Sequence, residues 1–201
     1  MTDLVIGLTG PTGAGKSTVA AAFQKAGCLI VDADRIARET IADEKCLAAL
    51  KAEFGNDIVG EDNRLNRTLL AQRAFADQRS TERLNAITHP LIKEEVIRKI
   101  AEYRQQTAKA IILDAPLLFE SGSDSLCTTS VAVTAPAEVR LYRIVNRDSI
   151  TPELARARMS MQQDDAYYSS RARYQLTGTM SDDDIQERVN QLLEKIIGDY
   201  A

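Results

Sequence analysis

Apolar and polar residues follow one another along the chain in two different rhythms. Short apolar runs of strand length are separated by longer segments in which apolar residues recur with helical spacing. Strands that alternate with helices in this way are typical of βαβ units, in which helices cover a parallel sheet. We therefore predict an α/β fold with a five-stranded parallel sheet flanked by helices. The predicted strands are LVIGL at 4–8, CLIVDA at 28–33, AIILDA at 110–115, SVAVT at 130–134 and, more weakly, YQLT at 174–177.

The gap between the second and third predicted strands is too long for a simple crossover. Residues 35–108 have a mixed helical pattern that is interrupted by FGNDIVGEDNRLN at 54–66. We predict an inserted helical subdomain that holds a second substrate. In it, Asn66 is expected to cap the helix RTLLAQRAFA, and Pro90 to lie in the first turn of the helix LIKEEVIRKIAEYRQ.

A second insertion is expected after the fourth strand, where Thr151, Pro152 and Glu153 form a helix-start signal. Ser181, followed by three aspartates, is expected to start the last helix. The predicted organisation has a nucleotide-binding core, a helical acceptor domain and a lid. The core comprises residues 1–34, 108–136 and 172–201, the acceptor domain residues 35–107, and the lid residues 137–171.

The first predicted strand runs into a glycine-rich segment, LTGPTGAGKST at 8–18. It fits G-x-x-x-x-G-K-[ST], the phosphate loop whose backbone N–H groups surround a polyphosphate. Lys16 supplies a cation for the β and γ oxygens, and Ser17 offers a hydroxyl to Mg²⁺. The segment predicts a nucleoside triphosphate site. Its expected residues are Gly10, Thr12, Gly13, Ala14, Gly15, Lys16, Ser17 and Thr18.

Acidic residues follow two of the predicted strands, at the edge of a parallel sheet where ligands bind. If the second strand continues through Asp32 and Asp34, both side chains lie on the same side of it. If Asp34 instead starts the next helix, it is the one nearer the cleft; either residue could also merely cap that helix. Asp114 ends the third strand, where it could act through Mg²⁺-bound water, orient the acceptor, or cap a turn.

Charge and composition narrow the class of protein. The chain has 201 residues, a net charge of -4 and a pI near 5.2, which argue against a general nucleic-acid binder. Residues 137–174 contain seven arginines and no lysine, a pattern that suits phosphate contacts but also a solvated helical face. The first residues lack the positive charge of a signal peptide, and no apolar run reaches membrane-spanning length, so we expect a cytoplasmic protein. Its three cysteines are not spaced as metal ligands.

The phosphate loop occurs in several classes of protein, and other features choose among them. A regulatory GTPase should carry N-K-x-D, but NRDS at 146–149 does not match it. A motor or transporter ATPase would have a catalytic acid after Asp114, where Ala115 and Pro116 stand. The acidic balance does not favour a tRNA-modifying transferase. A small-molecule kinase remains the best class, because two insertions and a short sheet provide a donor site, an acceptor site and a lid.

Five segments in this order resemble those of the dephospho-CoA kinase family. They are IGLTGPTGAGKSTVAAAF at 6–23, IVDADRIARE at 30–39, LNR at 65–67, LNAITHPLI at 84–92 and LDAPLLFE at 113–120. The resemblance implies Mg²⁺- and ATP-dependent phosphorylation of the ribose 3′-hydroxyl of dephospho-CoA. It also implies a P-loop kinase core, a helical CoA domain and a lid. Another small-metabolite or nucleoside kinase, or an ATP-binding regulator without an acceptor, stays open as an alternative.

The resemblance also implies roles for single residues. Asp34 corresponds to the proposed base, with Asp32 as second choice, and Lys16 and Arg143 complete the catalytic set, with Arg147 one turn further as a nucleotide contact. Mg²⁺ is expected on the Ser17 hydroxyl and, through water, on Asp32 or Asp114. Expected acceptor contacts are Asp32, Asn66, Arg67, His89, Asp114 and Leu118.

One family pattern is missing from this chain. Near the fifth strand, A-D-x-V-I-x-N-x-G is replaced by ARYQLTGT at 172–179, which leaves the adenine-side contacts open. The expected partner is the substrate dephospho-CoA, and no nucleic acid or membrane is expected to bind. We expect the protein to be a monomer or a weak homo-oligomer.

Overall fold

The computed structural model describes residues 2–60 and 63–200, which form two compact units. The first unit contains the described residues up to Asp32 and from Ile100 onward, and the second is Ala33–Lys99. Each unit has its own hydrophobic core. None of the helices in the described ranges is both long enough and apolar enough to cross a membrane.

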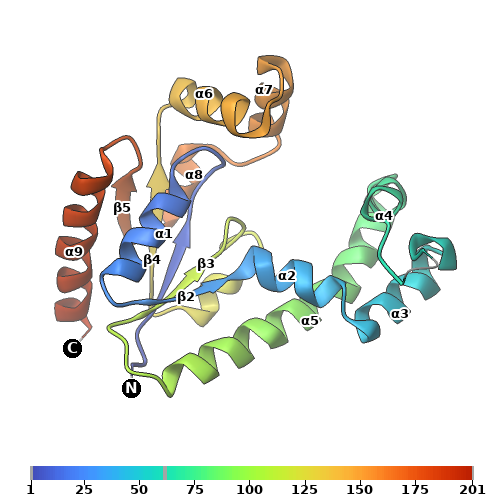
Figure 1. Ribbon diagram of the computed structural model, residues 1–201, viewed down its shortest axis with the longest axis horizontal. Helices are drawn as coiled ribbons and strands as arrows, with labels where there is room; N and C mark the ends of the chain where they lie inside the picture. The colour runs from blue at the N-terminus through green and yellow to red at the C-terminus, as the bar shows by residue number, and fades with distance from the viewer. Residues whose placement is uncertain (1, 61–62, 201) are drawn as a thin grey trace. The chain divides into compact units, whose positions relative to one another are not determined.

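The first unit is built on a five-stranded sheet in which every strand pairing is parallel (Figure 1). The strand order is β2-β3-β1-β4-β5. All five predicted strands are present, within one or two residues of the predicted bounds, so the predicted sheet is confirmed. The strands are β1 (Val5–Thr9), β2 (Leu29–Asp32), β3 (Ile111–Asp114), β4 (Thr129–Thr134) and β5 (Tyr174–Thr177).

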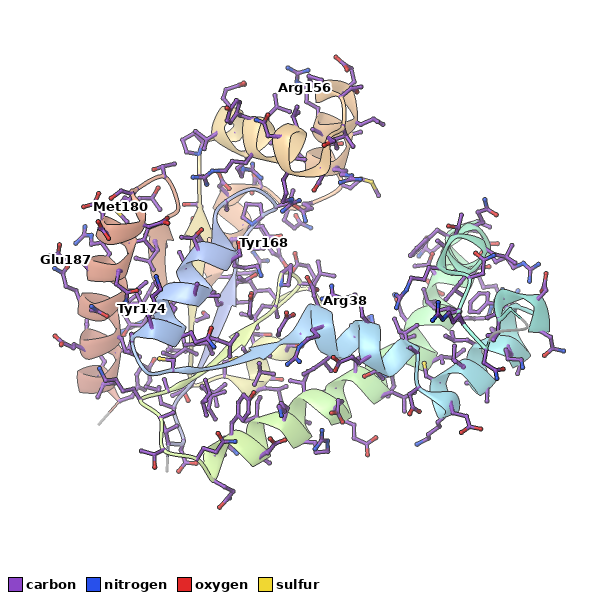
Figure 2. All side chains as sticks on the ribbon, viewed as in Figure 1. Arg38, Arg156, Tyr168, Tyr174, Met180 and Glu187 are labelled. Carbon is purple, nitrogen blue, oxygen red and sulfur yellow. The ribbon has the colours of Figure 1, made fainter. Side chains whose placement is uncertain are left out.

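Two helices far apart in sequence, α1 (Lys16–Lys25) and α9 (Asp182–Asp199), contact each other and pack against the sheet (Figure 1). Phe23 of α1 and Val189 of α9 are fully buried in the same core as Leu8 and Val131. The polar side of α9 faces away from this core, and Figure 2 shows Glu187 of that side pointing outward. This packing fixes the start of α1 directly after β1, which is where the glycine-rich segment lies.

Residues at the helix ends have the conformations and hydrogen bonds that these positions require, and for Thr151 and Ser181 this confirms the predicted helix starts. Gly27 follows α1 with φ of 95°, a conformation in which a side chain is strained. The hydroxyl of Thr151 accepts a hydrogen bond from the Leu154 amide and caps α7 (Pro152–Ser160). Ser181 caps α9 by accepting from the amide of Asp184.

Helices α6 (Ala137–Asp148), α7 and α8 (Asp165–Arg171) follow one another between β4 and β5. Tyr168 of α8, labelled in Figure 2, is fully buried. Its hydroxyl donates to Glu120 at 3.2 Å. Burial raises the pKa of this phenol above its ordinary value, so the hydroxyl keeps the proton that it donates. Helix α8 is thereby anchored to the segment that follows β3.

The second unit is helical. It contains α2 (Ala33–Ile41), α3 (Glu44–Phe54), a short 3₁₀ helix (Asn56–Ile58), α4 (Arg67–Ala74) and most of α5 (Gln78–Arg104). Its core is a cluster of buried side chains from α3, the 3₁₀ helix and α4, namely Cys46, Leu50, Phe54, Ile58, Leu70 and Ala74. Asn66 caps α4 as predicted, since its side chain accepts from the Leu69 amide at 3.0 Å. Residues 61 and 62 of the predicted break lie outside the described residues.

The prediction for Pro90 is wrong. Pro90 lies in the middle of α5, and the helix starts at Gln78. Proline is favoured in a first turn because it lacks an N–H, and an interior position costs one backbone hydrogen bond. Here helical residues on both sides, including the buried Thr88 and Val96, keep the helix continuous.

Candidate active site

The glycine-rich segment forms a tight loop between β1 and the first turn of α1. Gly15 is the N-cap of α1 with φ of 97°, a left-handed conformation that glycine adopts without strain. Gly13 also has a positive φ, and a Cβ there would lie 2.8 Å from the carbonyl oxygen of Arg140. The loop therefore has two positions, Gly13 and Gly15, at which its conformation favours glycine over any other residue.

Several backbone N–H groups of this loop donate to no protein acceptor within the described part of the chain. They belong to Gly13, Gly15, Lys16 and Ser17. The positive end of the α1 dipole lies at the same place. Gly13, Gly15 and Lys16 are half-buried, and N–H groups away from water are normally hydrogen-bonded, so these free donors at a helix N-terminus indicate an anion site. The remaining predicted loop residues include Ala14, which is buried, and Thr18, whose amide donates to Gly15.

Two aspartates end the neighbouring strands β2 and β3, and Lys16 pairs with one of them. The ammonium group of Lys16 forms a salt bridge with Asp114 at the end of β3. Asp32 ends β2 and is the direct register partner of Asp114 on the neighbouring strand. Both Lys16 and Asp114 are largely buried, with side chains 17% and 14% exposed. The first unit thus places a cation and two carboxylates beside the loop N–H groups.

Asp34 is found in the first turn of α2, because β2 ends at Asp32 and the helix begins at Ala33. Of the two geometries considered from the sequence, the structure has the one in which Asp34 starts the helix. The Asp34 side chain is exposed, whereas Asp32 is half-buried. Asp32 and Asp34 therefore occupy different environments although they are two residues apart.

The two predicted lid arginines make different contacts. Arg143 of α6 donates to the carbonyl oxygen of Gly13 at 3.2 Å and to that of Gly178 at 2.7 Å. It therefore joins the phosphate loop to the turn after β5. Arg147 instead donates to both carboxylate oxygens of Asp148, and this contact holds the pKa of Asp148 below its ordinary value.

The remaining predicted acceptor residues lie at α4 and α5 of the helical unit and after β3 of the first unit. Asn66 and Arg67 begin α4, where Arg67 donates to the carbonyl oxygen of Arg38 on α2 at 3.4 Å. His89 is exposed on α5. Leu118, in the first unit, is fully buried and lies against Gly7, where a Cβ would be 2.6 Å from it.

Two residues beside the phosphate loop were not anticipated from the sequence. Gln162, between α7 and α8, accepts a hydrogen bond from the Thr12 amide. Gly178 approaches the loop so closely that a Cβ would lie 1.8 Å from the Ala14 oxygen. Nothing in the polar stretch MQQDD marks Gln162, which is 150 residues from its partner. A glycine directly after a strand was a usable signal for Gly178.

A parallel sheet with this strand order, a phosphate loop after β1 and a lysine-aspartate pair at the strand ends define a P-loop kinase core. A model of the dephospho-CoA kinase family matches residues 4–184. The chain belongs to the dephospho-CoA kinase family, and it is therefore a transferase.

Individual relatives agree with this assignment over nearly the whole chain. A dephospho-CoA kinase of Corynebacterium diphtheriae is 38% identical over 95% of this chain and 96% of its own length. One of Lactobacillus johnsonii is 34% identical over 95% of this chain and 97% of its own. Among solved structures, TT1252 of Thermus thermophilus superposes with a TM-score of 0.84 and 30% identity, covering 97% of this chain and 98% of that one. A Campylobacter jejuni dephospho-CoA kinase, at 21% identity and a TM-score of 0.65 over 96% of both chains, supports the fold.

Proposed function

We propose that the chain transfers the γ-phosphoryl group of ATP to the 3′-hydroxyl of the ribose of dephospho-CoA. The products are coenzyme A and ADP, and the reaction is the last step of coenzyme A biosynthesis. The observation that carries the proposal is the family match across residues 4–184. The free N–H groups of the phosphate loop support it independently, because they are suited to a polyphosphate.

The donor side of the reaction uses residues of the first unit. The loop N–H groups bind the phosphates, and Lys16, held by Asp114, neutralises charge on the β and γ oxygens. The guanidinium of Arg143 faces the backbone of the same loop and, in our proposal, stabilises the phosphoryl group during transfer. Arg147 is proposed as a further nucleotide contact, within a lid of residues 137–171.

Mg²⁺ fits the oxygen-bearing residues beside the loop. The Ser17 hydroxyl is exposed in the first turn of α1, and Asp32 and Asp114 end adjacent strands. Among the described residues no cluster of three or more His, Cys, Asp or Glu side chains forms a metal cage. Mg²⁺ typically keeps several waters and is shared with substrate phosphates, so a hydroxyl and one or two carboxylates suffice. The ion would supply charge neutralisation on the triphosphate.

The acceptor side is assigned to the helical segment 35–107. We propose that Asp34 accepts the proton of the ribose hydroxyl and orients its oxygen for in-line attack, while Asp32 holds Mg²⁺-bound water or the loop. Asn66, Arg67 and His89 are proposed contacts of dephospho-CoA, with Asp114 and Leu118 from the first unit. The family resemblance supports these assignments residue by residue.

The proposed setting is the cytoplasm, where the free thiols of Cys28, Cys46 and Cys127 stay reduced. Burial raises the pKa of Cys28 to about 11, which keeps this thiol unreactive near neutral pH. We propose a monomer or weak homo-oligomer that needs neither a nucleic acid nor a membrane.

The test is turnover by the purified chain with ATP, Mg²⁺ and dephospho-CoA. Mass spectrometry should detect coenzyme A, with ADP formed in equal amount and only when dephospho-CoA is present. Lys16→Ala should abolish both products, because it removes the cation at the β and γ oxygens. ADP release that does not depend on dephospho-CoA, or that responds to a nucleoside acceptor instead, would reject the proposal.

A further inference from the structure

A second side chain from the segment between β4 and β5, in addition to Arg143, is hydrogen-bonded to the phosphate loop. The backbone N–H of Thr12 donates to Oε1 of Gln162 over 2.8 Å. Only the oxygen of a carboxamide accepts, so this contact fixes which way the Gln162 amide group points. Both residues are partly buried, which shields the bond from water.

The position of Gln162 is set by the elements on either side of it. Gln162 lies two residues before Asp164, the N-cap of α8. The Asp164 side chain accepts a hydrogen bond from the Tyr167 amide at 2.8 Å. Asp165, the first residue of that helix, forms an ion pair with the buried Arg140 of α6 at 3.8 Å. Arg140 in turn lies with its backbone against Gly13. Gln162 is therefore held beside the loop by two helices, and not by its own bond alone.

Two peptide groups of the loop, separated by one other, are restrained in this way. Gln162 binds the N–H of the peptide between Pro11 and Thr12, and Arg143 binds the carbonyl of the peptide between Gly13 and Ala14. Peptide groups are planar, so fixing one atom of each restricts the orientation of the whole group. The peptide between them carries the Gly13 N–H, one of the donors without a protein acceptor in the described ranges.

We infer that Gln162 is a positioning residue for phosphoryl transfer, which orients the Gly13 N–H by holding the preceding peptide group of the phosphate loop. The inference rests on the proposed kinase function and adds a residue to it. Donors that are already oriented toward developing charge stabilise a transition state without the cost of reorganisation. Gln162 need not touch ATP to have this effect, since it acts through the Thr12 peptide.

The experiment compares Gln162→Met with Gln163→Met. Methionine has a similar length but no hydrogen-bonding amide, and Gln163 is an exposed neighbour without a hydrogen bond in the described structure. Exchange of the Thr12 amide with solvent, followed by ¹⁵N–¹H NMR, should be about tenfold faster in Gln162→Met and unchanged in Gln163→Met. This readout requires no catalysis.

Kinetics then separate positioning from binding. At saturating ATP, the single-turnover rate of Gln162→Met should fall roughly three- to thirtyfold, the effect expected for one lost hydrogen bond, while the Kd of ATP changes by less than about threefold. Gln163→Met should keep the wild-type rate. If wild-type enzyme forms coenzyme A and Gln162→Met does so equally fast, the inference fails and the proposed function stands. If the wild type forms no coenzyme A, it is the proposed function that fails.

Gln162→Glu serves as the conservative rescue. Its carboxylate still accepts from the Thr12 N–H, so amide exchange should remain slow. The added negative charge should raise the Kd of ATP, by an amount that decreases with salt, yet the rate at saturating ATP should recover most of the wild-type value. A Gln162→Glu enzyme with a protected Thr12 amide but a rate as low as that of Gln162→Met would overturn the inference.

Discussion

At the scale of single residues, the end of β2 separates two aspartates that differ in environment. Asp32 is half-buried and pairs in register with Asp114, which already binds Lys16. A carboxylate in this position is suited to hold charge or metal-bound water, because it lies beside the phosphate loop. Asp34 is exposed in the first turn of α2, in the other unit. It is the better candidate for a group that must exchange a proton with a substrate.

This difference predicts opposite effects of two amide substitutions. Asp34→Asn keeps the shape but cannot take the proton, so kcat should fall about 10²- to 10⁴-fold while ATP binding is retained. Asp32→Asn should weaken binding of Mg²⁺ and ATP together. The measurement is single-turnover phosphoryl transfer beside equilibrium ATP binding for both variants. Near wild-type transfer by Asp34→Asn, or loss of transfer with intact binding in Asp32→Asn, would show that the base is wrongly assigned.

Arg143 shows what the sequence could and could not reveal about a single residue. The family resemblance implied that it is a lid arginine of the catalytic set. In the structure its guanidinium spans the carbonyls of Gly13 and Gly178, whereas Arg147 is held by Asp148. A guanidinium binds two acceptors through separate nitrogens held in one rigid plane, a geometry that the single nitrogen of lysine does not provide. Which acceptors it binds depends on the close approach of two loops, and residue spacing does not contain that information.

At the scale of secondary-structure elements, the turn after β5 is the least anticipated part of the core. The Gly178 amide donates to the Thr134 oxygen at 2.9 Å, and its Cα approaches both Ala14 and Gly15. Arg143 binds the carbonyl of the same residue. The turn therefore forms one wall of the phosphate loop through backbone contacts. This chain lacks the family's asparagine pattern here, and a glycine permits the approach.

We expect Gly178→Ala to damage both stability and nucleotide binding. Its Cβ would lie 1.8 Å from the Ala14 oxygen, so the turn or the loop must shift. Overpacking of this kind costs about 1–3 kcal/mol, and each kcal/mol lowers Tm by roughly 2–4 °C in a chain of this size. ADP affinity, measured by calorimetry, should fall as the loop moves.

Gly198→Ala is the matched control for this prediction. Gly198 lies in the last turn of α9, and a Cβ there meets nothing within 4 Å. Alanine is the better helix former, so Tm should stay the same or rise slightly. An unchanged Tm and ADP affinity in Gly178→Ala would mean that the turn is not a rigid wall of the loop.

Element prediction succeeded where the signal is local. Apolar runs of strand length gave all five strands, and Asn66, Thr151 and Ser181 gave three helix starts, because capping depends on residues within one turn. Pro90 failed because the helix continues on both sides of it, so the positional preference of proline did not decide where the helix starts. Strand order was not predictable, since it depends on contacts between residues about a hundred positions apart, such as Val5 and Ile111.

At the scale of the whole molecule, the chain divides its residues between two compact units with separate cores. The phosphate loop, Lys16 and Asp114 belong to the first unit, while Asn66, Arg67 and His89 belong to the second. The sequence indicated such a division, because a segment of more than sixty residues between two strands cannot be a simple crossover. The assignment of donor to one unit and acceptor to the other is a proposal that the chemistry of these residues supports.

Hydrogen exchange read out by mass spectrometry can test that assignment on the intact chain. Ligands slow amide exchange where they bind or order the backbone. ADP alone should protect peptides covering 8–18 and 137–178. Dephospho-CoA alone should protect peptides covering 63–74 and 84–92, which contain Asn66, Arg67 and His89.

A Lys16→Ala chain supplies the control, because it should lose the protection by ADP and keep that by dephospho-CoA. The two patterns are expected to be distinct, since the predicted contacts of each ligand lie mainly in a different unit. If dephospho-CoA protects only peptides of the first unit and leaves 33–99 unchanged, the helical segment is not the acceptor domain. The roles proposed for Asn66, Arg67 and His89 would then have to be given up, while the kinase core and its phosphate loop would stand.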